Sequence, residues 1–409
     1  MISKTSPLDS QAPRLKSLPP LSLYIHIPWC LKKCPYCDFN SHATHPDTPV
    51  PEDAYITALV RDLESMVPNV WGRRLTSVFF GGGTPSLFSA TSIDKILTAV
   101  RTLLPLEPAA EVTLEANPGT FEAQKFADFR AAGINRLSIG IQSFNPKHLQ
   151  ALGRIHNDQE AYNAIEIAQK NFDNINLDLM YGLPNQSVKD AHKDIHTTCS
   201  MDVSHISAYH LTLEPNTLFH RYPPELPDDE QSVDMQTVIE QTLKEHHYHH
   251  YETSAFSKRG RTSLHNKNYW LFGDYLGIGA GAHSKISFEY KIIRQMRYKH
   301  PREYLEKTLE TGAGSETAIQ SQHELTRADR GFEFMMNAMR LTDGFESAMF
   351  QDRTGLPITV ILSQLDEAER RGFIERDHLY IKPTLVGKRF LNNLLQIFLP
   401  VPGSSKFDR

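Results

Sequence analysis

The sequence predicts an α/β fold: a partial (β/α)6 barrel followed by a mostly helical, winged-helix-like C-terminal domain. Six short β-rich runs recur in the first half of the 409-residue chain, with amphipathic stretches between them. Such alternation indicates right-handed βαβ units and a parallel sheet. Six units are fewer than the eight of a closed barrel, so we expect the sheet to stay open. After residue 214 the pattern changes to longer helical and polar segments.

The elements follow from hydrophobic periodicity. The expected strands are short apolar runs at 23–27, 77–80, 111–116, 136–141, 175–180 and 205–213. The expected helices repeat apolar residues every three or four positions, at 52–67, 92–104, 121–133 and 158–170. Residues 228–248 predict one long helix with an acidic first turn. The polar stretch 308–325 predicts a linker.

The chain divides into a barrel, an extension and a C-terminal domain. We expect a disordered tail over 1–20, the barrel over 21–250, its extension and the linker over 251–318, the C-terminal domain over 319–400 and a second tail over 401–409. The C-terminal domain is expected to run helix, helix, hairpin, helix, over 327–341, 358–372, 373–384 and 385–399. A winged-helix-like order invites a DNA-binding interpretation, but fold alone does not set function. We favour a packing or lid role.

Composition excludes several classes of protein. Hydrophobic content of 40% and charged content of 22% are typical of a globular protein. A net charge of −5 argues against a nucleic-acid surface, which is normally basic. No apolar run approaches the ~18 residues of a transmembrane segment. The polar, proline-broken start lacks the apolar centre of a secretory signal, so we expect a cytoplasmic protein.

Three of the four cysteines, Cys30, Cys34 and Cys37, lie within eight residues with the spacing C-x3-C-x2-C. Crowding without an export signal indicates a metal or redox site in a reducing compartment. Zinc normally takes four ligands, so it would need His26 or His42 as well. We expect the leftover Cys199 to be a buried, inert thiol.

A [4Fe–4S] cluster is the other site that fits the three thiolates. Such a cluster takes a thiolate on each iron, so three thiolates leave one iron open for a chelating ligand. The amino and carboxylate groups of S-adenosylmethionine form such a ligand, and an electron from the cluster can then split its sulfonium bond. Placed after the first strand of a β/α repeat, the spacing resembles that of the radical S-adenosylmethionine (SAM) superfamily, which implies a radical SAM barrel.

Polar and glycine residues follow the other expected strands. In parallel β/α folds, ligands bind beyond the carboxyl ends of the strands. These positions hold the run Gly81–Pro85, then Glu115, Asn117, Gln142, Ser143, Arg154, Asp178, Tyr209, His210 and Glu214. Each alone is explained as a turn, a helix cap or a satisfied polar residue. Their joint placement predicts one binding rim.

Six stretches together resemble the family of oxygen-independent coproporphyrinogen III oxidases and their relatives. They are LYIHIPWCLKKCPYCDFNS, FFGGGTPS, LEANPGT, LSIGIQSF, GRIHN and DLMYGLP, and the resemblance extends over residues 21–400. It implies that Cys30, Cys34 and Cys37 bind the cluster and that Tyr36 packs on a second ligand site. It also implies a set of residues around SAM: Tyr24, Gly82, Gly83, Thr84, Glu115, Gln142, Arg154 and Asp178.

Within this family, the haem-chaperone branch is favoured over the oxidases. The oxidase pattern resembles C-x3-C-x2-C-x-C, and Phe39 stands at the position of its fourth cysteine. The oxidases also carry a longer N-terminal segment, whereas only some twenty residues precede the first expected strand here. The segment HNKNYW, 265–270, resembles a signature of the chaperone branch. This resemblance makes His265 a haem-iron ligand, whereas a hydrogen-bonded His in the core is the structural alternative.

The resemblance implies haem as a further ligand, haem-accepting proteins such as those of the respiratory chain, and an electron donor for the cluster. We expect no coproporphyrinogen oxidase activity, although oxidative decarboxylation of porphyrinogen propionates remains the alternative function. The histidine run 245–252 is expected at a helix end on the surface, and the glycine-rich stretch 276–283 is expected to form a close-packed turn.

Overall fold

The structure is a computed structural model that describes residues 13–44, 49–119, 123–309 and 318–400. Its centre is a twelve-stranded sheet whose six middle strands are parallel and follow chain order. These strands are β1 (Leu21–Ile27), β4 (Leu75–Gly82), β5 (Leu106–Ala116), β6 (Arg136–Gln142), β7 (Ile175–Tyr181) and β8 (His205–His210). The six strands expected from the sequence are confirmed, although the last ends three residues earlier.

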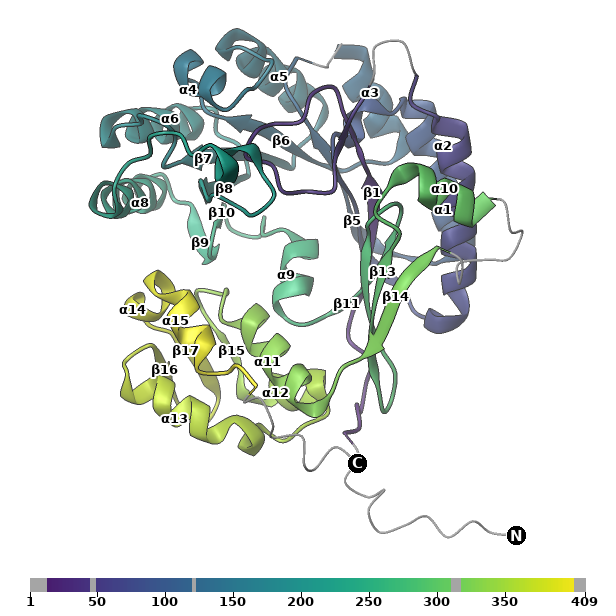
Figure 1. The fold of residues 1–409 in the computed structure, drawn as a ribbon, viewed down its shortest axis with the longest axis vertical. Coiled ribbons are helices and arrows are strands. Elements are labelled where there is room, and N and C mark those ends of the chain that lie inside the picture. The colour runs from purple at the N-terminus through teal and green to yellow at the C-terminus, as the bar shows by residue number, and fades with distance from the viewer. Residues whose placement is uncertain (1–12, 45–48, 120–122, 310–317, 401–409) are drawn as a thin grey trace.

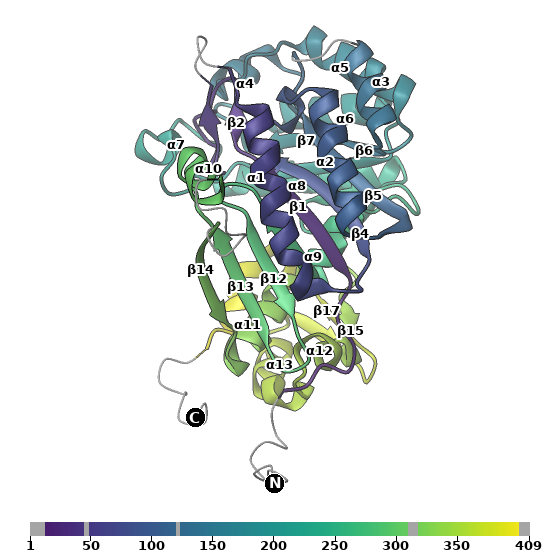
Figure 2. The same cartoon turned by 90° about the vertical axis from the view of Figure 1, so that its right-hand side faces the viewer.

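Antiparallel strands extend the sheet at both edges. On one side lie β10 (Ala255–Ser257) and β9 (His249–Glu252). On the other side β11 (Asp274–Ile278) runs parallel to β1 and leads into an antiparallel meander. The meander strands, seen edge to edge in Figure 2, are β12 (His283–Ser287), β13 (Ile292–Arg297) and β14 (Ile319–Glu324). The sheet ends at β14 and β9, so the barrel is open as expected.

The prediction of a linker over 308–325 is wrong for residues 319–324, which form the strand β14. This strand is polar and largely exposed, so its sequence lacks the apolar alternation of a half-buried strand. Its backbone pairs with β13 from Ile293↔Glu324 to Arg297↔Ile319. By this pairing it belongs to the large sheet, whereas the sequence assigned residue 319 onwards to the C-terminal domain.

Helices cover the outer face of the parallel strands (Figure 1). They are α1 (Glu52–Met66), α2 (Ala90–Leu103), α3 (Ala123–Ala132), α5 (Asp158–Asn171), α6 (Val188–Ser200) and α8 (Asp229–Glu245). Caps define several starts: the Asn157 side chain accepts from Glu160 N, and the Glu160 carboxylate accepts from Asn157 N. The expected helices agree, although residues 121–122 lie outside the described part. Helix α6 was missed because its buried face includes Asp194 and Thr198.

Alternation along β1 separates the core from the interior of the barrel. Leu23, Ile25 and Ile27 are fully buried in the main hydrophobic cluster. Tyr24 and His26 point to the opposite face and line a cavity there. The side chains available for chemistry therefore lie inside the barrel.

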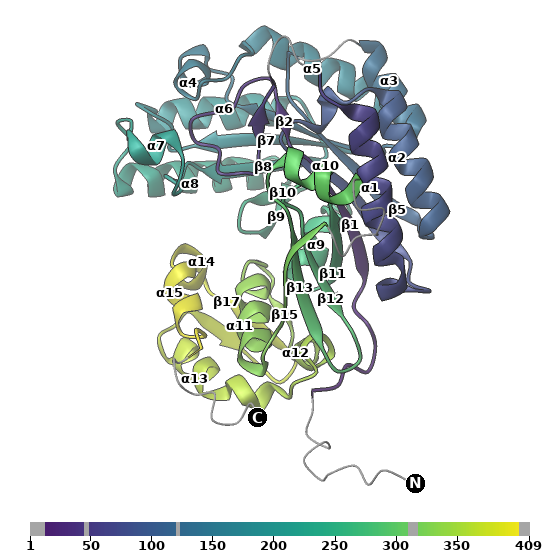
Figure 3. The same cartoon turned by 45° about the vertical axis from the view of Figure 1, so that its right-hand side comes forward.

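The C-terminal domain has a separate core, in which Phe334 packs edge-on against Phe345 and Phe350. Figure 3 shows it beside the meander, with α9 (Leu264–Trp270) between them and the barrel. Its helices are α11 (Arg327–Ala338), α12 (Ser347–Thr354), α13 (Leu362–Arg370), α14 (Leu385–Arg389) and α15 (Leu391–Gln396). Its sheet holds β15 (Phe345–Glu346), β17 (Tyr380–Pro383) and β16 (Ile374–Arg376). The sequence missed α12 and β15, and the last helix breaks at Phe390.

The two expected tails lie partly outside the described residues, which begin at 13 and end at 400. Residues 13–20 were expected to be disordered, and this is wrong. Leu15 is buried and its N–H donates to Glu289 O at 2.8 Å, while Pro19 O accepts from the Arg73 guanidinium at 2.6 Å. In the described part of the chain, no helix is long and apolar enough to cross a membrane.

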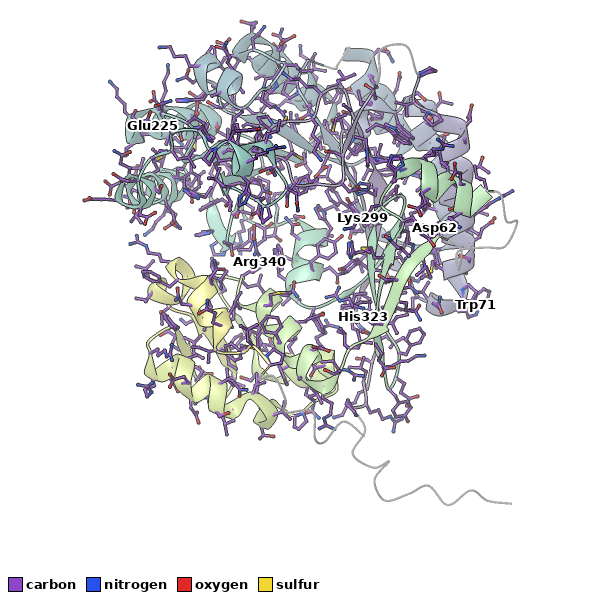
Figure 4. The ribbon with its side chains drawn as sticks, in the orientation of Figure 1. Asp62, Trp71, Glu225, Lys299, His323 and Arg340 are labelled. Carbon is purple, nitrogen blue, oxygen red and sulfur yellow. The ribbon has the colours of Figure 1, made fainter. Side chains whose placement is uncertain are left out.

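A buried ion pair joins α1 to the meander. Asp62, labelled in Figure 4, lies 3.0 Å from Nη2 of Arg297, and both side chains are fully buried. The Tyr304 hydroxyl also donates to this carboxylate, at 3.0 Å. Removing one partner of a buried pair leaves the other charge unpaired, which is strongly destabilising.

We expect Arg297→Met to lower the free energy of unfolding by about 3–5 kcal/mol, because Asp62 loses its counter-charge. The matched control is Lys170→Met, which breaks an exposed pair with Glu166 and should leave the stability nearly unchanged. Urea denaturation of the two variants measures the difference. Equal losses would contradict a structural role for the buried pair.

Candidate functional site

The loop after β1 carries the three cysteines across the carboxyl end of the sheet. Cys30 lies in β2 (Trp29–Cys30), which pairs in parallel with β3 (His42–Ala43). A backbone bond ties the loop to the end of β4, where Gly83 N donates to Ile27 O at 2.8 Å. The thiols are therefore presented by backbone that is anchored on both sides.

Two glycines let this loop approach β4. At Gly82 the backbone has φ +114, and a Cβ atom would meet the His26 ring at 2.6 Å. At Gly83 a Cβ atom would lie 2.5 Å from the carbonyl oxygen of Trp29. Any side chain here would push the cysteine loop away from the sheet. The two glycines are therefore required by the packing of the loop itself, whether or not a ligand is bound.

All three cysteines of the loop line one cavity of about 340 Å³ inside the barrel. Thr84 Oγ1 donates toward Cys30 Sγ at 3.5 Å, and the Arg154 guanidinium donates toward Cys34 Sγ at 3.8 Å. Burial raises the pKa of Cys30 and Cys37, and the neighbouring thiols raise it further. Binding of a metal by these thiols would displace their protons into the solvent.

Over the described residues, no three His, Cys, Asp or Glu side chains are spaced to hold a single metal ion. In a [4Fe–4S] cluster each thiolate binds a different iron, so three thiols lining one cavity are a donor set that suits such a cluster.

The wall of this 340 Å³ cavity, called the smaller cavity below, also holds two carboxyl groups. Ser138 Oγ donates to Asp178 at 2.8 Å, and Gly82 N donates to Glu115 at 3.2 Å. Burial, together with the charge of Asp178, raises the pKa of Glu115 to about 8. Burial also raises the pKa of Asp178. This wall gains a favourable interaction when a cationic group enters beside it.

A guanidinium group and side-chain amides complete the lining of the smaller cavity. The Arg154 guanidinium donates to Asn117 Oδ1 at 2.6 Å and to Gly140 O at 2.7 Å. Gln142 adopts a left-handed conformation, with φ 66, which a non-glycine residue holds at a cost. The Tyr36 ring lies 6.3 Å from the ring of Phe219 at the cavity edge. The cavity thus offers a cation, amides and carboxyl groups to one polar ligand.

A larger cavity of about 770 Å³ adjoins the smaller one and shares Cys37, Gly82 and Glu115 with it. It combines aromatic rings with positive charges, from Tyr24, Phe79, Tyr269, Trp270, Tyr275, Lys33, Lys285, Arg294 and Lys299. Lys285 is paired with Asp274 at 2.9 Å, whereas Lys299 forms no ion pair with a described residue. An anionic, flat, aromatic ligand matches such walls.

Asn40 links the cysteine loop to the wall of the larger cavity. Its side-chain amide donates to Ala280 O at 2.9 Å and to Lys299 O at 2.8 Å. Its own carbonyl oxygen lies 2.9 Å from His26 Nε2. The loop, the turn before β12 and the end of β13 therefore form one hydrogen-bonded unit.

The structure brings most of the predicted site residues together. The smaller cavity is lined by Cys30, Cys34, Cys37, Tyr36, Gly82, Gly83, Thr84, Glu115, Gln142, Arg154 and Asp178. Tyr24 lines the larger cavity, where its hydroxyl lies 2.8 Å from His26 Nδ1. Whether these residues bind the expected ligands stays a prediction.

His265 lies apart from the other predicted residues, because it lines neither cavity. It is buried, with Nδ1 2.7 Å from Glu111 Oε1 and its ring stacked on Phe79 at 4.2 Å. Burial lowers the pKa of His265, so the ring is neutral and its Nδ1–H donates a hydrogen bond to the carboxylate of Glu111. This is the hydrogen-bonded core arrangement named as the structural alternative, and the role of His265 as a haem ligand stays a prediction. Tyr269 and Trp270, from the same segment, do face the larger cavity.

Sequence reasoning missed the basic wall of the larger cavity. Lys285 on β12 and Arg294 on β13 are cross-strand partners, and Lys299 follows β13. The available signal was the period-two alternation in HSKIS and IIRQMR, which places His283 and Lys285 on one face. Ser138, in the smaller cavity, sits inside an apolar strand and gave no such signal.

Known proteins resemble the chain along its length. The family described as "Radical SAM superfamily" matches residues 24–197, and the "HemN C-terminal domain" matches residues 325–390. "Heme chaperone HemW" of Escherichia coli K12 is 46% identical over 384 residues, covering 93% of this chain and 99% of the relative. The protein of that name from Bacillus subtilis is 33% identical over 385 residues, covering 92% and 99%.

The fold also has a counterpart among solved structures. Coproporphyrinogen III oxidase (HemN) from Escherichia coli superposes with a TM-score of 0.78 at 22% identity, covering 93% of this chain and 90% of the other. At this identity the likeness shows a shared fold. It agrees with the open α/β sheet and the helical C-terminal domain described above.

We expect Gly83→Ala to reduce the iron bound after anaerobic reconstitution by half or more, because the new methyl group displaces the backbone at Trp29. The control is Gly331→Ala, a helical glycine whose nearest non-neighbouring atom would lie at an ordinary 3.5 Å. Iron and labile sulfide per chain are the measurement. Full iron binding by Gly83→Ala would show that the close approach does not position the cysteines.

Proposed function

Because the chain belongs to the HemW family of haem chaperones, within the radical SAM superfamily, we propose that it binds haem and delivers it to acceptor proteins. The observation that carries the proposal is the larger cavity beside the cysteine loop. Its volume of about 770 Å³ suits a macrocycle, its aromatic rings suit the porphyrin face, and its basic side chains suit the propionates. Respiratory proteins are the acceptors we expect.

Cys30, Cys34 and Cys37 are the residues that would hold a [4Fe–4S] cluster, with SAM in the remainder of the smaller cavity. When bound, such a cluster supplies one electron to the sulfonium group. The residues around it orient the ligand: Arg154 would face its carboxylate, and Glu115 its positive charge. A cluster with thiolate ligands needs a reducing compartment and an electron donor, so we place the protein in the cytoplasm.

The arrangement supports coupling between the two cavities. Asn40 holds the cysteine loop to the carbonyl groups of Ala280 and Lys299, so a shift of the loop moves the wall of the larger cavity. Cys37 and Glu115 line both cavities. In our proposal, the state of the cluster loop sets how firmly haem is held.

We expect the reconstituted protein to bind one haemin per chain and to pass it to an apo-acceptor such as a respiratory cytochrome subunit. The alternative enzyme would convert coproporphyrinogen to protoporphyrinogen. Phe39, at the position of the fourth cysteine and exposed at the mouth of both cavities, argues against it. Anaerobic incubation with SAM, a reductant and coproporphyrinogen tests this directly. Catalytic formation of protoporphyrinogen, with no haemin binding, would overturn the chaperone assignment.

We expect the affinity for SAM to rise about tenfold between pH 6.5 and 8, since Glu115 has a pKa of about 8 and its carboxylate attracts the sulfonium. Below this pH the group is protonated and uncharged, so the attraction is lost. Glu115→Gln should flatten the dependence, while the exposed control Glu166→Gln keeps it. Anaerobic calorimetry across this range measures it, and an affinity independent of pH in the parent protein would contradict the role of Glu115.

A further inference from the structure

The larger cavity has three histidines among its lining residues, His26, His42 and His283. Both ring nitrogens of His26 are engaged, by the Tyr24 hydroxyl at 2.8 Å and by Asn40 O at 2.9 Å. His42 is engaged by Asn40 Oδ1 at 3.3 Å and by the backbone at Lys299. In contrast, the His283 ring has no hydrogen bond to any described residue.

Neighbouring side chains leave the His283 ring accessible from the larger cavity. It is the first residue of β12, and its side chain is exposed to the cavity. The antiparallel register that pairs Tyr275 with Lys285 places Gly277 opposite it, so no side chain covers that flank. Its partner on the other flank is Met296. An imidazole so placed is accessible to a ligand from the cavity.

The charges around His283 favour a neutral ring. Burial lowers its pKa, and so do the nearby cations of Lys299, Arg294 and Arg297. A neutral imidazole keeps a lone pair for a metal, and iron is a common partner. Lys299 lines the same cavity as His283. A free cation beside a free imidazole suits a ligand that carries both a metal and a carboxylate.

We infer that His283 is an iron ligand for haem in the larger cavity, and that Lys299 receives a haem propionate. The inference rests on the proposed function and deepens it, because it assigns residues to the haem. It prefers His283 to His265, because the His265 ring lines neither cavity and is stacked on Phe79.

The test is the spectrum of ferric haem bound to the full chain with its cluster reconstituted and oxidised. Electron paramagnetic resonance and resonance Raman spectra report the nitrogen ligand. We expect His283→Ala to lose the histidine-ligated signal and to bind haemin at least tenfold more weakly, since loss of even an outer partner of a metal ligand costs about ten- to a hundredfold. Added imidazole should restore the signal by filling the space of the missing ring.

Two controls separate coordination from structure. Met296→Leu changes the cross-strand neighbour of His283 and should keep the parent spectrum. His265→Gln should also keep it, provided the variant retains its iron and sulfide content. His283→Gln, similar in size to the parent, should behave as His283→Ala does if ligation rather than packing is lost.

The outcomes are distinguishable. A parent spectrum retained in both His283 variants would overturn the inference, as would loss of the signal in His265→Gln alone. Failure of the parent protein to bind haemin at all would instead overturn the proposed function.

Discussion

The close approach of the cysteine loop to Gly82 and Gly83 is the constraint on which the rest of the site depends. Three thiols separated by three and two residues reach a common cavity only if the loop turns tightly over the end of β4. Backbone bonds and the β2–β3 pairing hold that turn, and the absence of side chains at the two glycines permits it. With the loop in place, the thiols face the carboxyl groups of Glu115 and Asp178 across one cavity.

The same loop also connects the two cavities. Cys37, Gly82 and Glu115 line both, and Asn40 ties the loop to the turn before β12 and to the end of β13. A chaperone must hold its cargo and release it, so the binding wall needs an element that changes with another site. The loop of Asn40 and the cysteines is such an element, because it joins the smaller cavity to the basic, aromatic wall of the larger one.

Much of this arrangement could be predicted from the sequence because it rests on local patterns. Period-two and period-3.6 alternation identified the six parallel strands and their helices, and the rule that ligands bind at strand carboxyl ends grouped residues as distant as Thr84 and Asp178. The polar strand β14 and the helix α6 were missed, since pairing and packing rather than hydrophobic pattern make them. The motif that singled out His265 did not show its partner Glu111, which comes from a strand more than 150 residues earlier in the chain. His283 was hidden in a glycine-rich stretch, and only the three-dimensional structure shows that its ring has no hydrogen bond to the described residues.

The most direct test of the account is the Mössbauer spectrum of anaerobically prepared, ⁵⁷Fe-labelled protein with and without SAM. We expect a four-iron cluster in which one iron site, the one without a thiolate, changes its spectrum when SAM is added, while the other three do not. A spectrum unaffected by SAM, or a preparation whose three cysteines hold a single zinc ion instead of iron, would contradict it.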